Sequence, residues 1–239
     1  MRLLVLGSLL LSGLLPLGPA ASTVVADEMC EVTGWSMSWG FKESFRAYLS
    51  GAIANGEWGV DGEVSYATPL FAVDSPRGQI APDGRSGSLD ATGSMTFFGH
   101  EGLLDQTLSD PRVVLSGATA QIVFDVEGDT QAGQSVSARD VSFVSVDISS
   151  ATIDGDTWSV TGAPTVLTEE GEAAFGTYPA GEPFDPVDLT VQTTPGCLVA
   201  GPSGTWFLGL GLGSALSVGL AIVLVRRWRG RERPTPAES

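Results

Sequence analysis

Hydrophobic and polar residues alternate along much of the chain after residue 60. The clearest case is TAQIVFDVEG, where every second residue is apolar: Ala120, Ile122, Phe124 and Val126. The same period of two recurs in VDLTVQT, through Val187, Leu189 and Val191, and more loosely in SGSLDATGSMTFFGH, through Leu89, Ala91, Met95 and Phe97. Successive side chains of a strand point to opposite faces, so this pattern predicts half-buried β-strands.

Short turn-forming clusters separate these segments at strand-like spacing: Asp74-Ser75-Pro76, Pro82-Asp83-Gly84, Glu127-Gly128-Asp129 and Asp154-Gly155-Asp156. Many short strands divided by such turns are typical of antiparallel folds. We therefore predict a mainly β fold, either an antiparallel β-sandwich or a partial barrel, with one or two short α-helices.

The segment WGFKESFRAY departs from this pattern because its spacing is helical. A helix over residues 41–50 would place three apolar side chains on one stripe: Phe41, Phe45 and Leu49. Ser44 and Tyr48 would then lie one turn apart on the adjoining stripe. From spacing alone two interpretations stay open, a helical cap whose tyrosine fills the edge of the core and a helix that presents both side chains to a binding site.

The N-terminus has the features of a secretory signal peptide. Met1 and Arg2 precede an apolar run over residues 3–17, and small residues suitable for cleavage follow. We predict that the signal peptide comprises residues 1–26. The mature protein would then begin outside the cytoplasm.

A second apolar segment, residues 206–225, contains 20 residues without a charge. A helix of this length covers roughly 30 Å, which matches the hydrocarbon core of a bilayer. The tail over residues 226–239 carries five arginines. The positive-inside rule therefore predicts a single-pass membrane protein with an extracellular N-terminal part and a cytoplasmic C-terminus.

Between these segments lies a predicted ectodomain, residues 27–199, joined to the membrane helix by a stalk at residues 200–205. The ectodomain contains 26 acidic and six basic residues, a formal charge of −20. Such a surface repels phosphate backbones and argues against nucleic acid as a partner. The negative charge of the ectodomain is otherwise explained by its contribution to solubility.

Cys30 and Cys197 are the only cysteines and bracket almost the whole ectodomain. In an oxidising environment a matched pair can form a stable disulfide, which here would join the first strand to the last beside the stalk. We predict this disulfide, with two free thiols as the alternative. A metal site made from these two cysteines has little support.

Three blocks of sequence carry a family resemblance: WGFKESFRAYLSG (39–51), GSMTFFGHEGLLDQTLSDPRVVLSG (93–117) and FGTYPAGEPFDPVDLTV (175–191). Together they resemble the HtaA domain family of haem-binding cell-surface proteins in actinobacteria. Two long motifs in the right order at a suitable separation make this a specific resemblance. It extends over nearly the whole ectodomain.

The resemblance implies a site for ferric haem b in which Tyr48 is the axial ligand to the iron. It further implies that Ser44 hydrogen-bonds within the haem pocket, that His100 supports the ligand tyrosine, and that Tyr178 lines the pocket. The chain departs from the family pattern at Thr177, where phenylalanine is usual. The resemblance therefore implies one aromatic ring fewer on the surface that stacks on haem.

Elementary chemistry agrees with a tyrosine ligand. A phenol in water loses its proton near pH 10, so binding as phenolate at neutral pH requires help from the metal and a neighbouring group. Phenolate is a hard anionic donor and favours ferric over ferrous iron. This suits haem in an oxidising exterior.

The function implied by the resemblance is haem capture at the cell surface for iron acquisition. The implied partners are other haem-binding surface proteins and the lipoprotein of a haem-import transporter. We predict no enzymatic activity. The alternatives are a surface adhesion or structural β-module without haem, and a hydrolase using paired carboxylates such as Asp154 and Asp156, which the Asp-Gly-Asp turn already explains.

Overall fold

The computed structural model describes residues 29–200. The predicted signal peptide, membrane helix and cytoplasmic tail lie outside the described residues, as does the stalk apart from Ala200. The segment boundaries and the membrane topology therefore stay predictions. Within residues 29–200, no helix has both the length and the apolar character needed to cross a bilayer.

The described chain forms thirteen strands, two α-helices and one short 3-10 turn. The strands are β1 (Cys30–Trp39), β2 (Glu57–Gly62), β3 (Val64–Ala67), β4 (Leu70–Ser75), β5 (Arg77–Ile80), β6 (Ser86–Asp90), β7 (Gly93–Gly99), β8 (Leu104–Ser116), β9 (Thr119–Asp129), β10 (Ser135–Asp147), β11 (Thr152–Asp154), β12 (Thr157–Leu167) and β13 (Pro183–Thr193). The helices are α1 (Glu43–Leu49) and α2 (Glu169–Phe175), and the 3-10 turn is η1 (His100–Gly102). The prediction of a mainly β fold with one or two short helices is confirmed.

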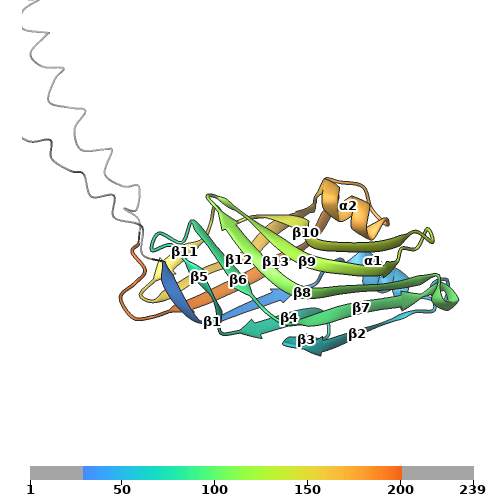
Figure 1. The fold of residues 1–239 in the computed structure, drawn as a ribbon, viewed down its shortest axis with the longest axis horizontal. Coiled ribbons are helices and arrows are strands. Elements are labelled where there is room, and N and C mark those ends of the chain that lie inside the picture. The colour runs from blue at the N-terminus through green and yellow to red at the C-terminus, as the bar shows by residue number, and fades with distance from the viewer. Residues whose placement is uncertain (1–28, 201–239) are drawn as a thin grey trace, which may run out of the picture.

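The strand pairings in residues 29–200 are all antiparallel, and they run in a closed ring. The order around the ring is β1, β5, β6, β8, β9, β10, β12, β13 and back to β1. Of the two predicted architectures, this favours the partial barrel over the sandwich. β7 and β2 extend from β8, and β4 and β3 extend from β1, toward the end of the molecule where α1 lies (Figure 1).

The alternating segments form the inner face of this ring. Ala120, Ile122, Phe124 and Val126 on β9 are all buried, and Val187, Leu189 and Val191 are buried on β13. The β1 to β13 register pairs Trp35 with Val191, Met37 with Leu189 and Trp39 with Val187, so apolar residues stack in layers. Full burial of such a side chain stabilises the fold by about 1.5 to 3 kcal/mol.

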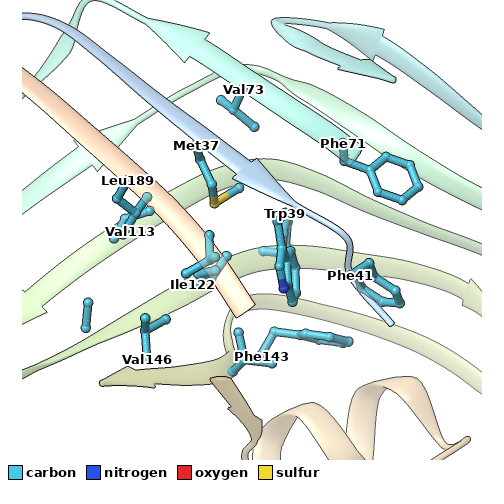
Figure 2. Packing of buried hydrophobic residues seen from close by; sticks show 14 of the residues in the cluster. Met37, Trp39, Phe41, Phe71, Val73, Val113, Ile122, Phe143, Val146 and Leu189 are labelled. Carbon is cyan, nitrogen blue, oxygen red and sulfur yellow. The ribbon is translucent and has the colours of Figure 1, made fainter. Parts of the chain in front are cut away.

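An aromatic cluster fills the end of the core beneath α1. Phe41 is at its centre, with ring centroids at 4.9 to 6.5 Å from seven other rings: Trp39, Phe45, Phe71, Phe97, Phe143, Phe175 and Phe184. Figure 2 shows Met37, Trp39 and Phe41 following one another from β1 into this interior. Helix α1 packs on this aromatic cluster through Phe45.

The helix begins later than its spacing predicts. Phe41 has a φ of 61° and Lys42 is extended, so α1 starts at Glu43 rather than at residue 41. A bulky residue in the left-handed region costs roughly 1 kcal/mol, and here that conformation is accompanied by complete burial of the Phe41 ring. Phe41 therefore packs with the apolar stripe of α1 although it lies in a tight turn before the helix.

Cys30 and Cys197 form the predicted disulfide, which joins the start of β1 to the chain after β13. It lies far from α1, because the 10 residues of β1 span roughly 30 Å. We expect the Cys30→Ala/Cys197→Ala double variant to lose about 2 to 5 kcal/mol of unfolding free energy, since the closed loop is long. Guanidinium denaturation would measure this loss, and reductant should lower the stability of the parent but not of the double variant. An unchanged midpoint would contradict the prediction.

Candidate functional site

Helix α1 lies on the core with Tyr48 and Ser44 on its outer side. Phe45 and Leu49 are completely buried. The centroid of the Phe45 ring lies 5.0 Å from that of Phe175 and 5.2 Å from that of Phe97. Tyr48 is half-buried and Ser44 is exposed. The 3.6-residue period thus separates a packing stripe from a stripe that is open to solvent.

Asp185, on β13, fixes the orientation of this helix. Its carboxylate accepts hydrogen bonds from the backbone amide of Glu43 at 3.0 Å and from the guanidinium of Arg46 at 3.2 Å. Arg46 also donates to the carbonyl of Gly40 at 2.7 Å. A carboxylate at the first turn of a helix stabilises the free amides there. These contacts hold the start of the helix that carries Tyr48 against β13.

The hydroxyl of Tyr48 forms a short hydrogen bond with Nε2 of His100. The two residues are 52 positions apart, and their ring centroids lie 5.6 Å from one another. The backbone amide of His100 donates to the carbonyl of Ala54 at 2.8 Å, which ties η1 to the loop that follows α1. The family resemblance implies that His100 supports Tyr48, and the two side chains do lie in hydrogen-bond contact.

The backbone that carries His100 is strained. His100 and Glu101 have φ values of 54° and 56°, so two consecutive non-glycine residues occupy the left-handed region. Each costs roughly 1 to 2 kcal/mol there, and such strain persists where the surroundings impose it, commonly at functional sites. Here the turn directs the imidazole toward Tyr48 while Glu101 faces solvent.

A third side chain on the Tyr48 oxygen is Gln131, which sequence reasoning missed. Its Nε2 donates to the Tyr48 hydroxyl at 2.8 Å from the turn between β9 and β10, 83 positions away. A glutamine in a polar turn carries no signal in the sequence, because such residues are common in exposed turns. We refer to Tyr48, His100 and Gln131 as the Tyr48 cluster.

Ser44 and Tyr178 meet one helical turn away from the Tyr48 cluster. Their hydroxyl oxygens are 3.4 Å apart. The Tyr178 ring is stacked on Phe175 with a centroid distance of 6.2 Å, and the ammonium of Lys42 lies 5.0 Å from its centre. These contacts hold Tyr178 against the open side of α1, so the residues singled out by the resemblance gather on one surface.

The turn after α2 brings Tyr178 to this position. Gly176 ends the helix with a φ of 66°, a conformation that glycine adopts without strain. A Cβ at this position would lie 3.1 Å from the side chain of Thr130. Thr177, where the family usually has phenylalanine, is half-buried, and its hydroxyl donates to the carbonyl of Phe175 at 3.4 Å. It supports the turn and adds no aromatic ring to the surface.

Two exposed apolar residues lie in the segments that the backbone of His100 joins. Ile53 is 80% exposed and Leu103 is 63% exposed. The amide of Leu103 donates to the carbonyl of His100 at 3.2 Å, and Ile53 precedes Ala54, whose carbonyl accepts from the amide of His100. Large apolar groups beside convergent polar groups are typical of binding sites for small ligands with an apolar surface.

A comparison with protein families adds a match over residues 34–190 to the HtaA family. The chain belongs to the HtaA family. The matched region contains every residue of the Tyr48 cluster together with Ser44 and Tyr178. The disulfide lies outside it, with one cysteine on each side. A comparison with curated proteins found no match.

Solved HtaA structures share this fold. The C-terminal domain of HtaA from Corynebacterium glutamicum is 26% identical with a TM-score of 0.63, and the match covers 70% of this chain and 100% of that domain. The N-terminal domain of the same protein is 29% identical with a TM-score of 0.54, covering 68% and 98%. HtaB, a haem-binding protein of that organism, is 21% identical with a TM-score of 0.52, covering 68% and 95%, and shows the fold alone.

Proposed function

We propose that this HtaA-family chain binds ferric haem b at the surface of α1, with Tyr48 as the axial ligand to the iron. The observation that carries the proposal is the hydrogen-bonded pair of Tyr48 and His100, held half-exposed by a strained turn. Membership of the HtaA family supports the same conclusion.

The chemistry of the pair fits a phenolate ligand. A tyrosine binds iron as phenolate, so its proton needs an acceptor within hydrogen-bond reach. Nε2 of His100 lies within hydrogen-bond reach of the Tyr48 oxygen and is such an acceptor in the tautomer that carries its proton on Nδ1. One protein oxygen suits a metal whose equatorial positions are filled by a macrocycle, and a hard anionic donor favours the ferric state.

The surroundings fit a flat ligand with a large apolar area. Ile53 and Leu103 offer exposed apolar surface in the segments joined by His100, and Tyr178 offers a ring whose hydroxyl contacts Ser44. A porphyrin over Tyr48 would cover these side chains, and burial of apolar area stabilises such a complex by about 25 cal/mol for each Å². The hydroxyls of Ser44 and Tyr178 supply hydrogen-bonding groups at its edge.

The wider role that we propose is extracellular haem capture followed by transfer toward a haem importer, for iron acquisition. This rests on the predicted signal peptide, the predicted membrane helix at residues 206–225 and membership of the HtaA family. Other haem-binding surface proteins and a transporter lipoprotein are the proposed partners.

Titration of the ectodomain, residues 27–199, with hemin tests the proposal. This part has its own core and both cysteines, and the solved HtaA domain that it matches is covered over its full length. We expect a Soret shift that saturates at one haem per chain, with visible bands of a tyrosinate complex. A flat titration would favour the alternative, a surface adhesion or structural module without haem.

A further inference from the structure

We propose that Gln131 is a positioning residue for the Tyr48 ligand: its side-chain amide donates a hydrogen bond to the ligand oxygen and weakens the donation of that oxygen to iron. The inference rests on the proposed haem function. The observation behind it is the 2.8 Å contact between Nε2 of Gln131 and the hydroxyl of Tyr48.

The contacting atom of Gln131 assigns the direction of this bond. The atom of Gln131 that faces the Tyr48 hydroxyl is Nε2, which can only donate, so the phenol oxygen accepts from it. The single phenol proton is then available for Nε2 of His100, in the tautomer that carries its own proton on Nδ1. If the proton moves to His100, the phenolate oxygen accepts from both partners. In each case Gln131 is a donor.

The turn that carries Gln131 is anchored, which keeps its amide in place. Thr130 is completely buried, and its amide donates to the carbonyl of Gln134 at 2.9 Å. Its own carbonyl accepts from the amide of Gly133 at 2.8 Å. The Thr130 side chain packs against Gly176, at the end of α2. A ligand is oriented most effectively by partners that are themselves fixed.

Anchoring at Thr130 also connects the two halves of the site. The same turn contacts Tyr48 through Gln131 and the segment leading to Tyr178 through Thr130. His100 and Gln131 reach the Tyr48 oxygen from different segments, η1 and the turn between β9 and β10, so each can be altered without removing the other. An amide carries no titrating group, and its hydrogen bond is present in every protonation state of the pair.

Removing the Gln131 amide should change how strongly the Tyr48 oxygen donates to iron. A hydrogen bond to phenolate lowers the energy of its lone pairs, so its loss makes the oxygen a stronger donor to ferric iron. In Gln131→Ala the tyrosinate-to-iron charge-transfer band should therefore move to longer wavelength and the reduction potential should fall. Haem affinity should nevertheless weaken roughly tenfold, because the Tyr48 oxygen loses one of the two partners that orient it, and loss of such a partner of a metal ligand typically lowers affinity by at least that factor.

The contact is tested first without haem. In the ectodomain labelled with ¹⁵N-glutamine, the side-chain amide resonance of Gln131 should shift when Tyr48 is replaced by phenylalanine, because the substitution removes its acceptor. The side chain of Gln134, in the same turn, is exposed and should not respond. An unchanged Gln131 resonance would overturn the proposal.

The haem-bound forms of Gln131→Ala, Gln131→Glu and Gln134→Ala test the electronic role. We expect the band shift and lower potential in Gln131→Ala, a larger loss of affinity in Gln131→Glu because a carboxylate repels the phenolate, and parent behaviour in Gln134→Ala. Parent-like band and potential in Gln131→Ala would overturn the role of Gln131 while haem binding stands. A parent that fails to bind hemin at all would instead overturn the proposed function.

Discussion

Tyr48→Phe is expected to lower the haem affinity of the ectodomain by more than about 100-fold. Loss of a hydrogen-bonding partner of a metal ligand typically lowers affinity 10- to 100-fold, and loss of the ligand itself should exceed that. The substitution removes one oxygen from a half-buried ring and keeps the contacts of that ring with the core. We therefore expect the visible tyrosinate bands to disappear from a hemin titration while the thermal midpoint stays within a few degrees of the parent.

Tyr66→Phe is the matched control for this variant. Tyr66, on β3, is also partly buried against the core, with its ring 4.8 Å from that of Phe71. Its hydroxyl has no hydrogen-bond partner among the described residues, and its removal should leave the titration unchanged. If Tyr48→Phe bound hemin with the affinity and spectrum of the parent, Tyr48 would not be the ligand.

Much of the fold can be predicted from the period of the apolar residues. The alternation in β9 and β13 identified buried faces correctly, because a one-residue slip would expose a whole face. The choice between a sandwich and a partial barrel could not be made from the sequence, since ring closure depends on the pairing of β13 with both β1 and β12. Pairing between distant strands leaves no local pattern.

The candidate site was predictable only in part. Helical spacing placed Ser44 and Tyr48 on one stripe, and the family resemblance pointed to His100 and Tyr178. Neither identified Gln131, because its role comes from where the turn between β9 and β10 lies relative to α1. The start of α1 was misplaced for a related reason. Phe41 adopts a left-handed conformation that its apolar spacing does not reveal.

Ile53 and Leu103 are exposed apolar residues whose proximity to the site could not be predicted from the sequence either. A single exposed apolar residue is ordinary, and nothing in the sequence joins these two. Their significance comes from the backbone hydrogen bonds of His100, which bring the loop after α1 next to η1. Sites assembled from several loops are therefore apparent only once the strands that carry those loops are placed.

His100→Ala and His100→Asn are each expected to weaken haem binding about 10- to 100-fold and to speed its dissociation. Both remove the imidazole that is hydrogen-bonded to the Tyr48 hydroxyl. They differ in the backbone, because asparagine tolerates the left-handed conformation of residue 100 and alanine does not. Alanine should therefore lower the stability by roughly 1 kcal/mol more than asparagine. Hemin titration and thermal unfolding of the two variants separate the lost hydrogen bond from the backbone effect.

Glu101→Ala is the matched control for the imidazole itself. Glu101 occupies the same left-handed turn, with a φ of 56°, but its side chain is exposed and makes no hydrogen bond among the described residues. We expect the substitution to change stability little, because glutamate and alanine pay a similar Cβ penalty in the left-handed region, and to leave haem affinity near that of the parent. If Glu101→Ala weakened binding as much as His100→Asn, the geometry of the turn would govern affinity. Equal affinity in the parent and both His100 variants would mean that the phenolate needs no acceptor at this position, and the proton would have to leave Tyr48 directly to solvent.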